Sequence, residues 1–323
     1  MKFRVAHTML ACTLIVASVP TIAHAIADQP TEPGIVVQQP PRQEGPRFVL
    51  DGVLLEPVTY QYHDGAYHVS VRELMAQIDR DAEVEEAGGM LTLAAETVIV
   101  SGEDPREDET EHDDPHTLAG ELVQTEGMLD TLSLTARVGD WYVQANGRYF
   151  YVEDGIQEAN GQLLLPIRTL ARVLNLSVSY DGEHQVVYLS SKANTGYVVD
   201  GVDHYNEDDL YWLSRVIHAE SGNQSMEGQI AVGNVVMNRV RSKLFPDTIH
   251  DVLAQKNQFS TYRSGSLQRK VPGEDSVIAA KLVLDGAEVV PTALFFNTKN
   301  LKNSYAARTR DYVCTIGNHA FYA

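Results

Sequence analysis

The stretch EDDLYWLSRVIHAESGNQSMEGQIAVGNVVMNRVR, residues 207–241, predicts two helices joined by a short polar turn. One face of the first helix carries residues at i, i+3, i+7 and i+10, namely Leu210, Leu213, Ile217 and Glu220. This spacing gives an apolar stripe that ends in a carboxylate on the same face. Asn206 is a suitable N-cap for this helix, and Ser-Gly-Asn at 221–223 ends it.

The next segment, residues 228–240, is apolar on nearly every side, which is typical of a helix buried at the centre of a domain. Glu220 therefore lies against apolar neighbours and near the negative end of its own helix dipole. Both conditions disfavour the ionised carboxylate. We expect a half-buried carboxyl group with a raised pKa, which is what a general acid for glycosidic bond cleavage requires.

Five separated motifs continue this pattern to the end of the chain. They are AESGNQSMEGQIAVGNVVMNRV at 219–240, FPDTI at 245–249, QFS at 258–260, FFN at 295–297 and IGNHAFY at 316–322. In this order they resemble the cell wall hydrolase family that includes the spore cortex-lytic enzymes, over about residues 207–323. The sequence departs from the common family pattern after Glu220, where it reads Ser-Gly-Asn-Gln and family members often carry Ala-Arg-Gly-Glu.

The resemblance implies a lysozyme-like, mainly helical α+β domain that cuts the glycan strands of peptidoglycan, with Glu220 as its acid. The pair Glu220–Ser221 also resembles the Glu-Ser signature of lytic transglycosylases. By resemblance alone, Ser221 or Asn297 holds the N-acetyl group of the substrate, and Tyr322 closes the site. We expect a strand at 294–297 to bring Asn297 there.

The family resemblance also implies that the loop beginning with QFS lines the glycan cleft. Phe259 offers a stacking face for a sugar, and Gln258 and Ser260 offer hydrogen bonds. An ordinary loop beside the core is the competing interpretation. Around this loop we expect a short helix at 251–255 and a longer helix at 276–286, capped by Asp275 or Ser276.

Most glycosidases use two carboxylates about 5 to 9 Å apart. Here Glu227, Asp247 and Asp251 lie near a helix start or a turn, where acids are ordinary. A single privileged acid fits a lytic transglycosylase. In that reaction the acid protonates the leaving oxygen and its carboxylate then deprotonates the C6 hydroxyl of N-acetylmuramic acid, which closes a 1,6-anhydro ring.

Two other functions remain open. A zinc-dependent N-acetylmuramoyl-L-alanine amidase would need ligands such as His218, Glu220 and His319, but the chain has no His-Glu-x-x-His motif. The other is a non-catalytic wall-binding protein. Cys314 with His319 is a weaker candidate for a nucleophilic pair, because no third group that would orient them is evident. We expect no cofactor and no metal.

The N-terminus predicts export. Lys2 and Arg4 precede an apolar run at 9–19, and Ala23-His24-Ala25 follows as a cleavage site. We expect a signal peptide at 1–25, a Pro-rich linker at 26–46, no membrane span in the mature protein, and a location outside the cell in the envelope, in the cell wall or the spore cortex.

Charge separates the two halves of the mature chain. Residues 26–206 carry a net charge of -22, and residues 207–323 carry +1. No basic patch suggests nucleic acid as a partner. The expected partner is peptidoglycan, which is anionic and which the nearly neutral second half is better suited to approach.

An internal repeat organises the first half. Residues 65–78 align with 161–174 at a constant offset of 96, and the same offset relates Leu91 and Leu93 to Val187 and Leu189. Each copy predicts two strands, a helix and a further pair of strands, with a hairpin turn at Asp181-Gly182 in the second.

The repeat resembles the copper amine oxidase N-terminal-like domain, a stalk module of secreted bacterial proteins. We assign residues 47–190 to this α+β stalk, with an acidic insertion at 101–115, and residues 191–206 to a linker before the catalytic domain. Despite the name of the resembled domain, the histidines of this half lack copper-ligand spacing: His63, His68, His112, His116 and His184.

Overall fold

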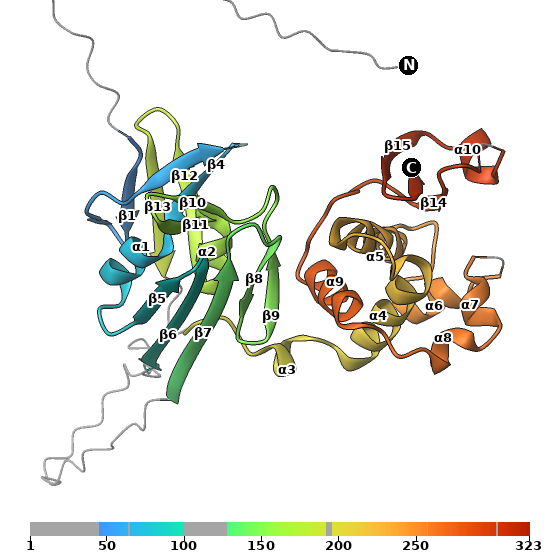
Figure 1. The fold of residues 1–323 in the computed structure, drawn as a ribbon, viewed down its shortest axis with the longest axis horizontal. Helices are drawn as coiled ribbons and strands as arrows, with labels where there is room; N and C mark the ends of the chain where they lie inside the picture. The colour runs from blue at the N-terminus through green and yellow to red at the C-terminus, as the bar shows by residue number, and fades with distance from the viewer. Residues whose placement is uncertain (1–44, 64, 100–127, 192–195, 257, 302) are drawn as a thin grey trace, which may run out of the picture. The chain divides into compact units, whose positions relative to one another are not determined.

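The computed structural model describes residues 45–323 except 64, 100–127, 192–195, 257 and 302. The predicted signal peptide, nearly all of the Pro-rich linker and the acidic insertion lie outside the described residues. Two groups of elements each contain buried hydrophobic clusters. We call them the first lobe, residues 45–198, and the second lobe, residues 207–323, and Figure 1 shows their ribbons. Among the described helices, none is long and apolar enough to cross a bilayer.

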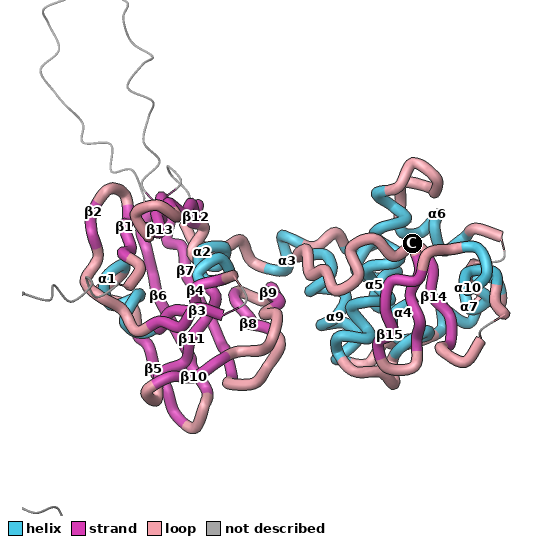
Figure 2. The backbone as a smooth tube through the Cα atoms, turned by 90° about the horizontal axis from the view of Figure 1, so that it is seen from above, coloured by secondary structure: helices cyan, strands magenta, loops and turns pink. Residues whose placement is uncertain are grey.

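Strands dominate the first lobe, as the magenta segments of Figure 2 show. Its first copy contains β1 (Arg47–Leu50), β2 (Val53–Leu54), β3 (Tyr60–His63), β4 (Ala66–Ser70), α1 (Val71–Ile78), β5 (Glu83–Ala87) and β6 (Met90–Ile99). Its second copy contains β7 (Met128–Arg137), β8 (Tyr142–Ala145), β9 (Arg148–Tyr151), β10 (Gln157–Ala159), β11 (Gln162–Pro166), α2 (Ile167–Val173), β12 (Leu176–Asp181) and β13 (Val186–Ser191).

The repeat seen in the sequence is present in the fold. Strand β4 starts at Ala66 and β11 at Gln162, and helices α1 and α2 start one residue after these strands end, again 96 residues apart. The central strands β4 and β11 pair antiparallel in a sheet of order β10-β11-β4-β3. The two copies therefore share one sheet, which neither could complete alone.

Two further sheets surround this shared sheet. One has the order β12-β13-β1-β2 and the other the order β5-β6-β7-β8-β9. The hairpin predicted at Asp181-Gly182 joins β12 to β13, where the Asp181 carboxylate accepts hydrogen bonds from the backbone N–H groups of Glu183 and His184. Side chains from the sheets and from both helices form the core of the lobe, in which Leu74 of α1, Leu91 of β6 and Leu170 of α2 are fully buried.

The second lobe consists of helices and a small antiparallel sheet of order β14-β16-β15. A short helix α3 (Gly201–His204) precedes it. Its elements are α4 (Glu207–Ser221), α5 (Met226–Arg241), α6 (Ile249–Ala254), α7 (Ser260–Arg263), α8 (Ser266–Arg269), α9 (Glu274–Leu284), β14 (Phe295–Thr298), α10 (Tyr305–Thr309), β15 (Tyr312–Ile316) and β16 (His319–Tyr322). The lobe is thus mainly helical with a mixed α and β composition.

Several boundaries differ from the expectation: α6 covers Ile249–Ala254 rather than 251–255, and α9 covers Glu274–Leu284 rather than 276–286. Helix α9 begins at Glu274, after an N-cap at Gly273, so neither Asp275 nor Ser276 caps it. Glu274 and Asp275 instead occupy its first turn, where the helix dipole stabilises acids. The segment that follows QFS, predicted as a loop, contains the single-turn helices α7 and α8.

Helix α5 is the buried centre of the second lobe, as predicted, but its polar residues are buried too. Asn234 donates to the carbonyl of Ala287 at 2.7 Å and accepts from the N–H of Val289 at 2.8 Å. Asn238 donates to the carbonyls of Val290 and Ala293, each at 2.9 Å. These side chains supply the hydrogen bonds that the irregular backbone at 287–293 lacks, because it forms no regular element there.

The side chain of Asp285, at the end of α9, is almost fully buried. It forms an ion pair with Arg148 of β9, accepts a hydrogen bond from the hydroxyl of Tyr205, and lies 3.2 Å from His204. The guanidinium of Arg172 on α2 donates to the Asp285 backbone carbonyl at 2.6 Å. A buried carboxylate is tolerated only when it is paired and hydrogen-bonded, and here three elements meet that requirement.

We predict that Asn234→Ala destabilises the protein by about 2 to 4 kcal/mol, because it leaves two backbone N–H groups and one carbonyl buried without partners. Urea unfolding followed by circular dichroism measures the change. Asn300→Ala, on an exposed turn, is the matched control and should change the unfolding free energy by less than about 0.5 kcal/mol. Equal effects of the two substitutions would contradict this account of the loop.

Candidate active site

Helix α4 delivers Glu220 as the sequence predicts. The side chain of Asn206 caps the helix by accepting from the N–H of Asp209 at 3.0 Å. Leu213 and Ile217 are fully buried against α5 and α9, so the helix has one fixed rotation about its axis. Glu220, one helical turn after Ile217, is consequently half-buried at the edge of that core.

The pKa of Glu220 is raised from its ordinary value of 4.5, mainly because burial disfavours the charged form. Two other interactions lower the pKa of Glu220 and so act against burial. The hydroxyl of Thr261 donates to Glu220 Oε1 at 3.0 Å, and the positive charge of Lys270 acts on the carboxylate. Burial is the larger effect, so the protonated form persists to higher pH than in an exposed glutamate.

Glu220 opens onto a cavity of about 540 Å³ that is formed by α4, α5, the segment at 258–259, α10 and the strands β14 and β16. The lining residues are Glu220, Arg239, Gln258, Phe259, Phe295, Phe296, Asn297, Thr298, Leu301, Ser304, Tyr305, Ala306 and His319. Glu220 is the only acid among these described residues. The volume lies within the range of about 300 to 1,000 Å³ that is usual for ligand sites.

Three of the substrate-binding residues expected from the sequence line this cavity: Gln258, Phe259 and Asn297. Gln258 is exposed, so its amide is free to face a ligand. Phe259 is only 5% exposed, and its ring packs in the core beside the guanidinium of Arg239. Little of that ring is therefore left for the sugar stacking that was expected of it.

Ser221 and Tyr322, which were also expected at the site, are not among the residues that line the cavity. Ser221 is fully buried, and its hydroxyl donates to the carbonyl of Ile217 at 2.9 Å, one turn back in the same helix. Tyr322 is buried in the small sheet, where its ring contacts Tyr312. Ser260 begins α7, and its side chain lies outside the described part of the structure.

Three polar atoms at the cavity have no hydrogen-bond partner within the described structure: Asn297 Oδ1, His319 Nδ1 and Arg239 Nη1. The amide nitrogen of Asn297 donates to the hydroxyl of Ser304, which fixes the orientation of the side chain. Burial lowers the pKa of His319, so its imidazole is neutral near pH 7. The Asn297 oxygen offers lone pairs to a bound ligand, whereas Nδ1 of the neutral His319 donates or accepts according to its tautomer.

Arg239 adds a cation to the wall of the cavity. Its Nε donates to the carbonyl of Leu294 at 2.8 Å, whereas its Nη1 has no partner among the described residues. The rings of Phe245, Phe259 and Phe295 lie 5.1 to 5.4 Å from the guanidinium carbon. Burial lowers the pKa of Arg239 to about 10, and the group remains charged at neutral pH.

Sequence reasoning did not assign Thr261 or Arg239 to the site, and it considered His319 only as a zinc ligand or as a partner of Cys314. Thr261 directly follows the QFS motif, which marked its neighbourhood without identifying this side chain. Arg239 lies on the helix that was predicted to be the apolar centre of the domain. No periodicity in the sequence indicates that its head reaches a cavity.

The residues suggested for a zinc site or for a cysteine nucleophile lack the arrangement that these chemistries require within the described residues. His218 Nδ1 accepts from the N–H of Gly273 at 3.3 Å. Among the described residues there is no group of three or more His, Cys, Asp or Glu side chains arranged to hold a metal ion. Burial, with a smaller contribution from Glu227, raises the pKa of Cys314, which disfavours the reactive thiolate.

The sequence matches to known proteins fall in the second lobe. Residues 223–322 match the sequence model of the Cell Wall Hydrolase family, and the match begins just after Glu220. The spore cortex-lytic enzyme of Oceanobacillus iheyensis is 27% identical over 117 residues, which is 36% of this chain and 42% of that protein. The spore cortex-lytic enzyme of Bacillus subtilis is 25% identical over 117 residues, covering 36% and 38%. The matched segment thus spans less than half the length of these relatives.

Two solved structures are also similar. The catalytic domain of the germination-specific lytic transglycosylase SleB from Bacillus anthracis is 27% identical, covers 39% of this chain and 100% of that one, and superposes with a TM-score of 0.35. The catalytic domain of the Bacillus cereus SleB protein is 27% identical, covers 37% and 92%, and has the same TM-score of 0.35. By sequence, the second lobe is homologous to a peptidoglycan hydrolase domain.

The raised pKa of Glu220 predicts a pH-dependent stability cost. Well below pH 4.5 the carboxyl group is protonated in both the folded and unfolded states, so its burial does not lower the free energy of unfolding through ionisation. As pH rises through the folded-state pKa, the buried group must ionise, and the folded state loses stability relative to the unfolded state. Glu220→Gln should therefore be more stable than the wild type at pH 7 and equally stable below pH 4.5.

Urea unfolding over a series of pH values measures this difference. Glu153→Gln, at an exposed position, is the control for the substitution itself and should change the unfolding free energy by less than about 0.5 kcal/mol. If Glu220→Gln loses stability at pH 7 relative to the wild type, the carboxylate is stabilised in the fold and our account of its burial is wrong.

Thr261→Val should raise the pKa of Glu220 further, because the lost hydrogen bond stabilises the charged form. Carbon-detected NMR titration of the Glu220 carboxyl group measures this shift directly. Thr292→Val, at an exposed position away from the cavity, should leave the titration unchanged. A lower pKa in Thr261→Val would mean that the hydroxyl interacts mainly with the protonated acid.

Proposed function

We propose that the second lobe cleaves the glycan strand of peptidoglycan between N-acetylmuramic acid and N-acetylglucosamine, as a lytic transglycosylase with Glu220 as its general acid and base. The observation that carries this proposal is the half-buried Glu220, whose pKa is raised and which is the only acid among the described residues of its cavity. The similarity to cell wall hydrolases and to spore cortex-lytic enzymes supports the choice of substrate.

The proposed reaction starts with Glu220 protonated. It gives its proton to the glycosidic oxygen as the bond from that oxygen to C1 of N-acetylmuramic acid breaks. The resulting carboxylate then takes the proton of the C6 hydroxyl, and the C6 oxygen bonds to C1 to close the 1,6-anhydro ring. Glu220 ends as it began, protonated, and no water is consumed.

One acid suffices for this sequence because the substrate supplies its own nucleophile. A hydrolytic muramidase would instead need a second carboxylate about 5 to 9 Å from the first, to act as nucleophile or to activate water. The cavity lining contains no second acid within the part of the chain that is described. The lytic reaction is therefore the one that these side chains support better.

Other residues have roles in binding and orientation. Thr261 holds Oε1 of Glu220, so the carboxyl group presents its second oxygen to the leaving group. Asn297 Oδ1, with its amide nitrogen fixed by Ser304, is suited to accept the N–H of the substrate's N-acetyl group. This supports Asn297 rather than Ser221 for that role, since the Ser221 hydroxyl is already bonded within its helix.

Glu220→Gln should fold and lose about 10²- to 10⁴-fold in activity, the usual contribution of a general acid and base. The assay is mass spectrometry of the muropeptides released from purified peptidoglycan. Wild-type protein should release anhydro-muramic ends that disappear in the variant. Glu227→Gln, which changes the nearest acid in the next helix, lies outside the cavity lining and should remain active.

The same assay separates the competing functions. Reducing muramic ends would indicate a muramidase, and free stem peptides would indicate the amidase. Loss of activity with a chelator, restored by zinc, would also favour the amidase. Release of no product by the wild-type protein would favour the non-catalytic wall-binding function.

A further inference from the structure

Three tyrosines of the first lobe, Tyr60, Tyr62 and Tyr180, surround a fourth, Tyr67. Its ring centroid lies 4.9 Å from that of Tyr62, 5.9 Å from Tyr60 and 5.8 Å from Tyr180. Tyr62 and Tyr60 belong to β3, Tyr67 to β4 and Tyr180 to β12, so three strands from two sheets contribute. Tyr62 is 63% exposed and Tyr180 is 51% exposed, although a buried core lies directly behind them.

Two hollows meet at Tyr62. One, of about 130 Å³, lies between Tyr62, Tyr67 and Tyr180, with Arg168 and Ser179 also in its lining. The other, of about 410 Å³, lies beside the outer strand β3 and is lined by Tyr60, Gln61, Tyr62, His63 and Gln157. We call these hollows and the four tyrosines the tyrosine groove. Because they share a wall, they form consecutive sites for an elongated ligand.

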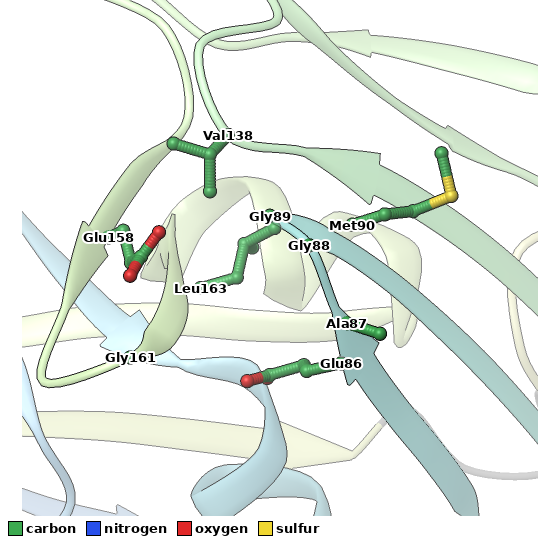
Figure 3. A pocket seen from close by; sticks show the side chains of 9 residues that line it. All are labelled: Glu86, Ala87, Gly88, Gly89, Met90, Val138, Glu158, Gly161 and Leu163. Carbon is green, nitrogen blue, oxygen red and sulfur yellow. The ribbon is translucent and has the colours of Figure 1, made fainter.

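The internal repeat provides a comparison within the molecule. At the offset of 96, Tyr62 and Tyr67 correspond to Glu158 and Leu163, and Tyr180 corresponds to Val84. The equivalent hairpin of the second copy lines a different cavity, shown in Figure 3, with Glu158, Leu163 and Glu86 around it. The same backbone thus forms without aromatic residues, so the fold does not require the exposed tyrosines.

We propose that the tyrosine groove binds the glycan strand of peptidoglycan, at a second site separate from the Glu220 cavity. The choice of ligand rests on the proposed function of the second lobe. Tyrosine combines a flat apolar ring with a hydroxyl at low cost in side-chain entropy. The apolar C–H faces of N-acetylated sugars pack on such rings, and their hydroxyl and amide groups bond to phenol hydroxyls, Gln61 and Gln157.

The charges favour a carbohydrate over a polyanion. Residues 26–206 carry a net charge of -22, which repels nucleic acid and also the acidic groups of peptidoglycan, so contact is expected through the uncharged sugar rings of the glycan strand. Sugar rings are uncharged, and Arg168, exposed in the lining of the smaller hollow, complements the isolated carboxylates that peptidoglycan carries along its strands. The smaller hollow has room for one substituent such as an acetamido group, while the sugar ring lies on the open faces of Tyr62 and Tyr180.

A site of this kind would keep the enzyme on its insoluble substrate. Tethering two binding modules raises the effective concentration of the second one at its target, provided that the connection between them permits both to bind. In this proposal the first lobe binds the cell wall, whereas the cavity of the second lobe cleaves the glycan strand. The prediction is a loss of wall binding without a loss of turnover on short soluble fragments.

The test uses the full chain carrying Glu220→Gln, so that the glycan stays intact, and measures co-sedimentation with purified insoluble peptidoglycan. The double variant Tyr62→Ala/Tyr180→Ala should lower the apparent affinity by about tenfold or more, as truncation of central aromatic contacts commonly does. Tyr188→Ala is the matched control, because this exposed tyrosine of the same lobe lies on β13 outside the groove, and it should bind normally. Unchanged unfolding midpoints will confirm that the variants are folded.

Competition identifies the ligand. Soluble oligomers of N-acetylglucosamine should displace the parent protein and have little effect on the tyrosine double variant. Equal affinity of all variants would overturn the inference. Displacement by stem peptides but not by sugar oligomers would overturn the glycan ligand and favour a peptide paired with the outer strand β3.

The outcome is independent of the catalytic assay. With Glu220 intact, the tyrosine double variant should cleave short soluble glycan fragments at the wild-type rate. If the wild-type protein releases no fragments of any kind, the proposed function fails, whereas the sedimentation measurement still reports whether the tyrosines bind glycan. If the wild-type protein cleaves peptidoglycan but the tyrosine substitutions leave co-sedimentation unchanged, only the proposal of a second binding site is wrong.

Discussion

The second lobe depends on the burial of helix α5 on all sides. Its apolar residues pack against α4 and α9, and a β-carbon at Gly233 would lie 2.9 Å from both Ile217 Cδ1 and Val283 Cγ2, so glycine permits the close approach of three helices. The side chains of Asn234 and Asn238 in the middle of the helix are buried away from water. Asn234 and Asn238 instead bind the backbone at 287–293, which leads directly into β14. One helix therefore fixes both walls of the cavity.

The chemistry of the site follows from this packing. Glu220 is half-buried because the α4 stripe that precedes it is locked against α5, and that burial raises its pKa. Thr261 bonds one carboxyl oxygen and limits the shift. The fold thus keeps an acid in a form that is unfavourable for stability and useful for proton transfer. The neutral His319, the Asn297 carbonyl oxygen and the Arg239 guanidinium surround the single acid of the described cavity lining.

The first lobe shows how a repeat acquires different surfaces. Its two copies share the central β4–β11 pairing, and the buried positions of each helix are apolar in both, as with Leu74 and Leu170. The hairpin tips are not constrained by this core, because they reach the surface. One tip carries Tyr62 where the other carries Glu158, so the surfaces can diverge while the core remains. An enzyme that acts on an insoluble polymer gains from a separate binding surface, since diffusion away from the substrate is slowed.

The sequence by itself determined the helix that carries Glu220, its Asn206 cap, the buried helix after it and the repeat, because these features depend on spacing within a short segment. Tertiary structure alone decided which side chains meet around the acid. Thr261 lies 41 residues from Glu220, and Arg239 reaches the cavity from a helix whose pattern indicates only a core. Ser221 follows Glu220 directly, yet one further step of about 100° around the helix turns its hydroxyl away from the cavity and toward Ile217. Local periodicity fixes the face on which a residue lies, but the partner that covers this face comes from distant parts of the chain.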